Sequence, residues 1–356
     1  MDRLSVLADL GRVLHVDVQE LIGRPWQVAP NGGADLAEIE GVRSHFSSYA
    51  ALVMGERPDV DSAALRSACV DAHRSYQAAD YRSLTGRLPG LLSAADSAWD
   101  NGRTSDVESM LSYVSLYVVA AKLLTKVGVG DLALVAADRA ATGALVADSP
   151  AARGLAAYQV VCALLRADRP DDAETLAVQM AGELTASARS DDPSTLSVAG
   201  ALWLIAAVVS ARKTERFEAY QRLAEAERLA GVLGEDGNHL WTAFGPTNVA
   251  IHRVAVAAEL GDPGEALNAA ADVKTDAFPA GLQSRRAQMH LDLAWAQSQR
   301  KRDAEAVLHL MEAEQVAPEA VYYNVIVREM VREMLARAKG HTCALDRLAV
   351  RAGVLA

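Results

Sequence analysis

Apolar residues recur at spacings of three and four along most of the chain, and no run alternates apolar and polar residues as a half-buried strand does. Aromatic residues make up only 5% of the 356 residues, while alanine is abundant. This balance favours close packing between helices over the β-branched and aromatic surface of a sheet. The sequence therefore predicts an all-α protein.

Three places in the chain combine a capping side chain with a proline. Ser149, Asp192 and Asp262 each precede a proline, whose missing N–H leaves nothing unsatisfied at the first position of a helix. Each of these pairs predicts the start of a helix.

A short charged turn followed by an alanine recurs five times. The alanines are separated by 40 to 47 residues, which is room for two helices and two turns, and they are Ala133, Ala173, Ala219, Ala266 and Ala306. Two antiparallel helices approach most closely near their turn, where a larger side chain would force them apart. This pattern predicts an array of helical hairpins, although a chain so rich in alanine also aligns easily with itself.

The C-terminal part of this array resembles a tetratricopeptide repeat. Residues 260–267 read Leu-Gly-Asp-Pro-Gly-Glu-Ala-Leu, and similar phrases occupy residues 304–308 and 316–320. The repeats are longer and less regular than the usual length of about 34 residues. A single helix over residues 321–339 is expected to close the array, with Met330, Val331 and Met334 inward and Arg328 outward.

Residues 4–23 form a phrase that ends in Leu-Ile-Gly and is split at His-Val-Asp. It is similar to the last two helices of the repressor-type helix-turn-helix domain in the xenobiotic-response-element (XRE) family of bacterial transcriptional regulators. Residues 241–262, which begin Trp-Thr-Ala-Phe-Gly-Pro-Thr-Asn, resemble actinobacterial members of that family with a C-terminal tetratricopeptide-like domain. The resemblance covers most of the chain.

This resemblance implies three regions. Residues 1–24 are expected to be the remnant of the helix-turn-helix domain, and residues 25–35, with two prolines and Asn-Gly-Gly, a linker. Residues 36–356 are expected to form a tetratricopeptide-like domain for ligand sensing and dimerisation. The helices that would enter the major groove should lie before Leu4, so this chain is either a truncated regulator or a relic that has lost DNA binding.

Composition bears on compartment and on partners. Acidic residues outnumber basic ones, 46 to 35, for a net charge of −11, which excludes a generally basic nucleic-acid coat. Three isolated cysteines suit a reducing compartment and give no disulfide framework or zinc site. The most apolar stretch, residues 198–211, is shorter than a membrane span and predicts a buried helix. A cytoplasmic protein that does not associate with membranes is expected.

No motif for nucleotide, zinc or serine chemistry occurs, so no enzyme, metal or cofactor is expected, although an enzyme with a motif-free site stays a third reading. Asn248 and His252 lie four residues apart on one helix and are candidate ligand-binding residues, unless Asn248 secures the preceding loop and His252 packs between helices. The other candidate ligand-binding residues are aromatic and carry one polar atom: Tyr113, Tyr117, Tyr158 and Trp241. The alternative for each of them is packing in the core.

The resemblance implies the sensor part of a transcriptional regulator. A small molecule or short peptide would bind the concave face of the repeat domain and change the orientation of two subunits in a homodimer. Promoter DNA would be a partner only with the missing helices present, and a tetratricopeptide scaffold for a protein partner is the alternative. If the excess of acidic residues extends to the concave face, the ligand should be cationic or neutral. Such an excess usually describes only the solvent-exposed outer surface.

We expect this chain alone not to bind promoter DNA at physiological salt, because residues 1–24 carry three arginines against four acidic residues and lack the groove-reading helices. Fluorescence anisotropy with labelled promoter fragments measures this directly. Tight, sequence-specific binding would show that the N-terminal segment has been misread.

Overall fold

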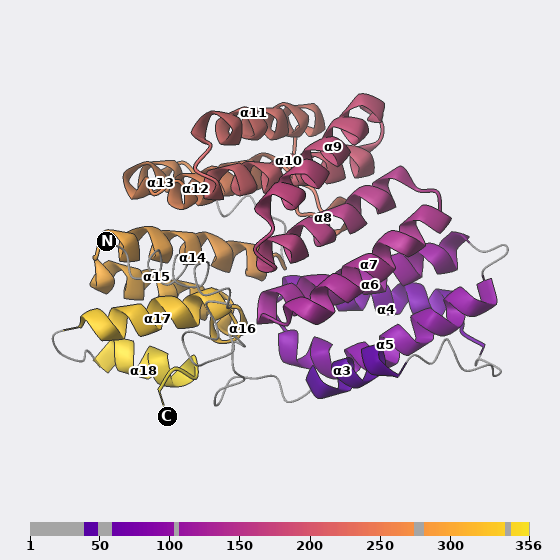
Figure 1. Cartoon of the computed structure of the whole chain (residues 1–356), viewed down its shortest axis with the longest axis horizontal. Helices are drawn as coiled ribbons and strands as arrows, with labels where there is room; N and C mark the ends of the chain where they lie inside the picture. Colours follow the sequence, from indigo (N-terminus) through magenta and orange to yellow (C-terminus); the bar gives the residue numbers. More distant parts are fainter. Residues whose placement is uncertain (1–38, 49–58, 103–106, 274–280, 339–342, 356) are drawn as a thin grey trace, which may run out of the picture.

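The computed structural model describes residues 39–48, 59–102, 107–273, 281–338 and 343–355, and every regular element within these ranges is helical. The all-α prediction is therefore confirmed (Figure 1). The expected helix-turn-helix remnant and linker, residues 1–35, lie outside the described residues.

Within the described chain, twelve of the helices pair into six antiparallel hairpins. In chain order these are α4 (Ser62–Gln77) with α5 (Tyr81–Gly102), α6 (Val107–Val127) with α7 (Gly130–Val146), α8 (Pro150–Arg166) with α9 (Pro170–Ser187), α10 (Pro193–Arg212) with α11 (Arg216–Leu233), α12 (Pro246–Glu259) with α13 (Pro263–Ala271), and α14 (Gln283–Gln299) with α15 (Asp303–Val316). The caps predicted at Ser149, Asp192 and Asp262 are confirmed, because each side chain accepts a hydrogen bond from a backbone N–H of the first turn.

All six hairpin turns share one backbone device. Each contains a residue with positive φ. The N–H of the residue that follows it donates to the carbonyl of the residue five positions before the donor, so a carbonyl in the last turn of the first helix gains a hydrogen-bond partner. The residues with positive φ are Ala79, Gly128, Asp168, Thr214, Gly261 and Lys301. The chain thus reverses within a few residues at every hairpin.

The five repeated alanines occupy one equivalent position. Each is the fourth residue of the second helix of its hairpin, each is fully buried, and each N–H donates to the residue that caps that helix. The prediction of hairpins built around these alanines is confirmed. The small side chain lets the two helices approach closely where the turn brings them together.

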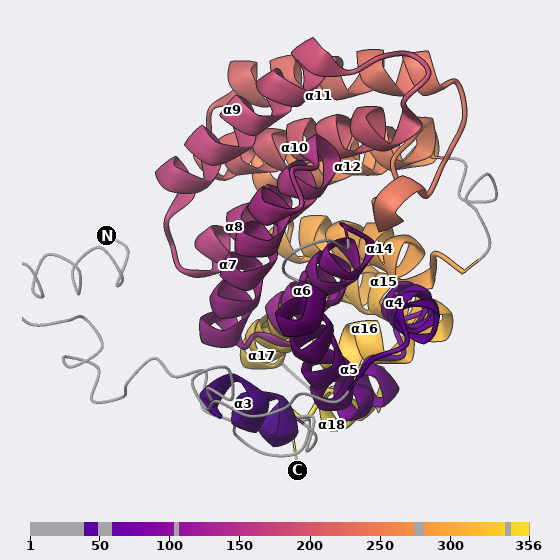
Figure 2. The ribbon, with the colours of Figure 1, turned by 90° about the vertical axis from the view of Figure 1, so that its right-hand side faces the viewer.

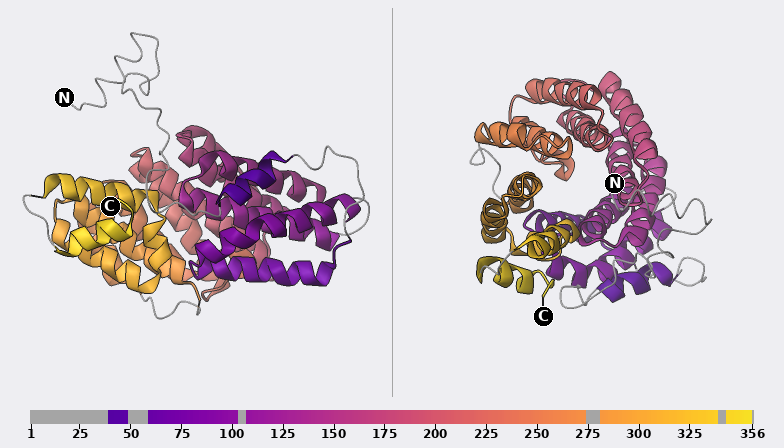
Figure 3. Two further views of the ribbon diagram at one scale, coloured as in Figure 1. Left: turned by 90° about the horizontal axis from the view of Figure 1, so that it is seen from below. Right: turned by 60° about the vertical axis from the view of Figure 1, so that its left-hand side comes forward.

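The first helices of the hairpins form a closed inner ring. Each of α4, α6, α8, α10 and α12 packs against the next, α12 packs against α14, and α14 returns to contact α4. Figure 3 shows this ring of helices from one end, and Figure 2 shows α14 beside α4. The second helices lie on the outside, so the first helices face the interior of the array.

The C-terminal end differs from the single closing helix expected over residues 321–339. The chain instead forms α16 (Pro318–Tyr322) and α17 (Val325–Arg337), because Asn324 caps a new helix by accepting from Ile326 N at 3.0 Å. Arg328 is buried, not outward, and its Nε donates to the Tyr322 carbonyl at 3.2 Å. A further helix, α18 (Cys343–Arg351), follows, while α3 (Ile39–Ser47) packs on α5 near the other end.

Two described helices, α6 and α10, are long and apolar enough to cross a membrane. The fold buries 72% and 89% of their most apolar windows, so both serve as core helices of the ring. The prediction that residues 198–211 form a buried helix is therefore confirmed.

Replacing Ala219 with leucine should destabilise the chain by about 1–3 kcal/mol, because the added atoms overpack the crossing of α10 and α11. Chemical denaturation gives the free energy of unfolding. Ala224→Leu on the exposed face of the same helix is the control, with an expected change below about 0.5 kcal/mol. Equal losses for the two variants would contradict the role given to the repeated alanine.

Candidate functional site

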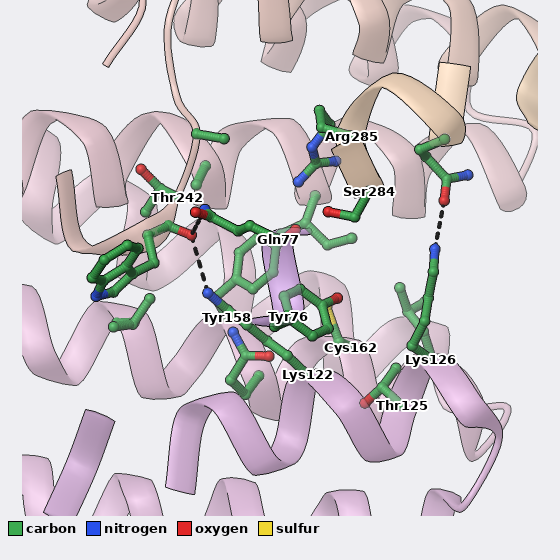
Figure 4. A pocket seen from close by; sticks show the side chains of 18 of the residues that line it. Tyr76, Gln77, Lys122, Thr125, Lys126, Tyr158, Cys162, Thr242, Ser284 and Arg285 are labelled. Atoms are coloured by element: carbon green, nitrogen blue, oxygen red, sulfur yellow. Dashed lines mark hydrogen bonds between the residues drawn. The ribbon is translucent and has the colours of Figure 1, made fainter. Parts of the chain in front are cut away.

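The inner ring encloses a cavity of about 280 Å³. Its walls come from α4 and α6 at the start of the array, from α8 and α10, and from α14 and the beginning of α17 at its end. The loop between α11 and α12 completes the wall with Trp241, Thr242 and Ala243. Residues far apart in the sequence therefore meet around one space (Figure 4).

The charge of the cavity is opposite to that of the chain. Among the 24 described residues that line it, five are basic and none is Asp or Glu. The basic residues are Lys122, Lys126, Arg166, Arg212 and Arg285. The net charge of −11 therefore does not extend into this cavity, which removes the sequence-based reason to expect a cationic ligand.

Lys122 is a half-buried lysine in the C-terminal half of α6. Its Nζ donates to the Trp241 carbonyl at 3.1 Å and lies 6.0 Å from the centre of the Tyr76 ring. Burial, and then the charge of Arg285, lower its pKa from 10.5 to about 7. Lys122 is thus held where adding a proton is costly.

Lys126 joins α6 to α14. Its Nζ donates to Gln288 Oε1 at 2.7 Å, and Gln288 Nε2 donates to Asp292 Oδ1 at 2.9 Å. Burial is the main cause that lowers the pKa of Lys126 to about 8, and burial also raises the pKa of Asp292 to about 7. These hydrogen bonds link α6, near the start of the array, to α14, near its end.

The three arginines differ in their partners. Arg212 pairs with Glu259 at 2.9 Å, whereas no described carboxylate forms an ion pair with Arg166 or Arg285. Burial and the neighbouring Arg212 lower the pKa of Arg166. Arg285 lies beside Tyr158, where burial raises the pKa of the phenol and a hydrogen bond from Arg285 opposes that rise.

Two polar groups on the cavity wall lack a partner among the described residues. Gln159 is 1% exposed, and its Nε2 donates no hydrogen bond. The Thr125 hydroxyl is also buried and without a hydrogen-bond partner. Buried polar groups in folded proteins are nearly always satisfied, so these two mark a place where a partner is missing.

The loop between α11 and α12 carries Trp241 into the ring. Leu240, Trp241 and Ala243 all have positive φ, which is unfavourable for residues other than glycine. Asn238 and Gln77 hold the loop through two amide hydrogen bonds of 2.9 Å, and the indole of Trp241 stacks on His73 at 5.0 Å. Contacts with α4 and α6 thus maintain a strained loop at the cavity wall.

The six predicted ligand-binding residues separate into three groups. Tyr158 and Trp241 line the cavity. Asn248 and His252 are buried in α12, do not line it, and touch each other through His252 Nδ1 and the Asn248 carbonyl at 2.9 Å. Burial, with Arg285 second, lowers the pKa of His252 to about 3. Asp236, and not Asn248, ties the loop to the start of α12, because its carboxylate accepts from Thr247 N and Oγ1.

Tyr113 and Tyr117 do not line the cavity. Tyr117 is fully buried and its hydroxyl donates to Asp96 at 2.7 Å and accepts from Arg139 at 2.8 Å. Tyr113 stacks on Trp99 at 4.7 Å. Both residues lie in the packing between α6 and its neighbours, and whether any of the six predicted residues binds a ligand stays a prediction.

Sequence reasoning did not single out the basic residues of the cavity. One signal was present, because Lys122 is the one charged residue in the apolar run from Val118 to Leu124. Charged side chains are rare in such buried segments. Arg285 gave no such signal, since it lies in a polar segment with a neighbouring arginine. Only the closure of the ring brings it opposite Lys122 (Figure 4).

The arrangement is suited to binding. In the described parts of the chain, no three His, Cys, Asp or Glu side chains are placed to hold a metal ion. Neither a protein-family model nor a curated protein matches the chain. The site is therefore characterised by its own geometry, a small basic cavity between the two ends of a hairpin array.

Replacing Lys122 with methionine should raise the free energy of unfolding at neutral pH and reduce its pH dependence. Between pH 7 and 10.5 the unfolded chain binds more protons at this lysine than the folded chain does. The free energy of unfolding therefore increases with pH across that window, by up to about 1.4 kcal/mol per pH unit, and is lowest at its pH 7 end.

Urea denaturation at several pH values measures this slope. Lys301→Met, which removes an exposed lysine, is the control and should leave the slope unchanged. The same slope in the Lys122 variant as in the unmodified protein would mean that Lys122 stays fully charged in the folded state.

Proposed function

We propose that this chain is the ligand-sensing domain of a cytoplasmic transcriptional regulator, and that it binds a small molecule, or the end of a short peptide, in the cavity of the inner ring. The regulator assignment rests on the resemblance of residues 4–23 and 241–262 to XRE-family proteins. The binding assignment rests on the cavity. At about 280 Å³ the space is at the small end of ligand pockets, which favours a compact ligand.

One observation carries the proposal: the cavity is built from both ends of the hairpin array. Lys126 on α6 bonds Gln288 on α14, and the backbone N–H of Arg82 on α5 donates to Glu319 on α16 at 2.9 Å. A ligand in the cavity contacts α4 and α6 together with α14. Its binding energy therefore depends on how the first and last hairpins sit relative to each other.

This dependence supplies the mechanism. A ligand that prefers one arrangement of the ring by about 1–3 kcal/mol changes the affinity of a coupled site about 5- to 150-fold. In a homodimeric regulator, the coupled site would be the pair of DNA-reading domains. No covalent chemistry is required.

A scaffold that binds a protein partner without controlling DNA is the second candidate. Large apolar side chains are exposed on the outer helices, including Leu145 at 68% on α7, Phe217 at 74% on α11 and Leu308 at 61% on α15. Such residues are suited to contacts between proteins.

Native mass spectrometry on protein purified from its own host tests the sensor proposal, because it reports subunit number and retained ligand together. Ala201→Phe is the informative variant, since Ala201 lines the cavity and the larger side chain fills it. Ala224→Phe on the exposed face of α11 is the matched control. Thermal denaturation of both variants shows that they fold.

A dimer that carries a discrete extra mass, retained by the control and lost from Ala201→Phe, is the expected result. A chain with no extra mass in any form would overturn the sensor proposal. A monomer that instead retains a stoichiometric host protein would support the scaffold.

A further inference from the structure

The structure explains some of the five basic residues of the cavity without any ligand. Lys126, Arg166 and Arg212 each lie in the last turn of a helix, where a cation is favoured by the helix dipole. Arg212 also has Glu259 as a partner. Stability of the helices is therefore a sufficient reason for these three.

Lys122 and Arg285 have no such reason. Lys122 lies in α6 before its last turn, and Arg285 lies in the first turn of α14, where a cation opposes the helix dipole. No described carboxylate forms an ion pair with either residue, and none lines the cavity. Asp292, on α14 behind Gln288, acts on the charge of Arg285, but burial raises its pKa to about 7. Burying charges of the same sign together is unfavourable unless something of opposite charge compensates them.

Several hydrogen-bond donors surround the same space. Ser284 and Arg285 reach into it from the first turn of α14, and Lys122 faces them from α6 (Figure 4). The N-terminus of α14 has no side-chain cap. Independently, Gln159 on α8 is 1% exposed and its Nε2 has no partner among the described residues. Uncapped N–H groups, a free amide and two cations are the groups that hold an anion.

Apolar side chains also line the cavity, between the polar residues of α8 and α10. Leu155 and Leu165 on α8, with Val198, Ala201 and Ile205 on α10, line the cavity without any polar atom in their side chains. A ligand that satisfies both kinds of side chain needs an acidic group and an apolar body.

We propose that the cavity binds a small amphipathic organic anion, whose acidic group lies between Lys122, Arg285 and the first turn of α14 and whose apolar body packs against α8 and α10. This inference rests on the proposed ligand-binding function and names the class of ligand. A carboxylate on a compact apolar body has the required chemistry, whether it belongs to a free organic acid or to the C-terminus of a short peptide.

Binding of an anion is coupled to protonation. The groups that face Lys122 are Arg285 from α14, Tyr76 and His73 from α4 and Cys162 from α8, and none of them is an anion at neutral pH. A bound anion favours the charged lysine, so binding takes up a proton. The affinity should therefore fall as the pH rises from 7 to about 9, by up to about tenfold per pH unit.

A pair of dyes with one shared skeleton tests the ligand class. Anilinonaphthalenesulfonate carries a sulfonate on an aromatic body, and phenylnaphthylamine is the same body without charge. Fluorescence titration of the full chain gives the affinity for each. The informative variant is Lys122→Met combined with Arg285→Gln, and the control is Arg300→Gln at the exposed residue that directly follows α14.

The expected result is tighter binding of the sulfonate dye. The double variant should weaken that binding by about tenfold or more and leave the neutral dye unchanged, while Arg300→Gln should change neither. Loss of sulfonate affinity between pH 7 and about 9 in the unmodified protein gives the same answer without any variant. The pH dependence of sulfonate binding therefore tests the anion proposal even if the double variant fails to fold.

Equal affinity for the two dyes, unaffected by the double variant and by pH, would overturn the anion proposal and leave the sensor proposal standing. Binding of neither dye would also overturn it, whereas the retained mass in native mass spectrometry decides the sensor proposal separately. The two failures are thus distinguishable.

Competition against the sulfonate dye distinguishes the sources of the acidic group. Naphthoate represents a free organic acid, and an acetylated apolar tripeptide represents a peptide C-terminus. Displacement by either acid supports the proposal and identifies its source. Displacement by the C-terminal amide of the same peptide, as strong as by its acid, would contradict it.

Discussion

Contact between α14 and α4 turns a linear series of hairpins into a closed ring, and the cavity exists only because of this closure. The curvature that permits it comes from close approaches between helices. In five of the six hairpins, a fully buried alanine at the fourth position of the second helix keeps the two helices close together. On α10, Gly200 leaves room for the Phe244 ring, since a Cβ at that position would overlap the ring. Small residues at crossings thus set the geometry that larger residues then fill.

Closure also places charges where the sequence does not suggest them. Ion pairs on the outside, such as Arg43 with Asp131 and Arg253 with Glu227, are exposed and contribute little to stability. Inside the ring, Lys122 and Arg285 line a cavity without carboxylates, where burial makes the charge of Lys122 costly. The net charge of the chain describes its outer surface, and the interior follows its own balance.

The strained loop around Trp241 belongs to the same arrangement. Three residues with positive φ are held by the hydrogen bonds between Gln77 and Asn238, by the stack of Trp241 on His73 and by Phe244 beneath α10. Backbone strain of this kind persists only where surrounding contacts maintain it. A loop that spans from α11 to the opposite side of the ring, bonded to Lys122 through the Trp241 carbonyl, couples the cavity wall to the packing of α4 and α6.

The sequence by itself determined the helices, their pairing and many of their ends. The three-and-four spacing of apolar residues, the capping residues before prolines and the five repeated alanines are local or nearly local signals, so they could be read without a fold. One long helix over residues 321–339 was wrong because Asn324, a capping residue, starts a new helix inside an apolar pattern that continues through it. The site was only partly predictable: Tyr158 and Trp241 were singled out as aromatic residues with a polar atom, but Lys122, Arg285 and Gln159 were not. Their meeting joins residues more than a hundred positions apart, and no local pattern specifies that distance. Tertiary structure alone decided which face of each inner helix turns toward the enclosed space, because that choice depends on the small angle added at every hairpin until the ring closes.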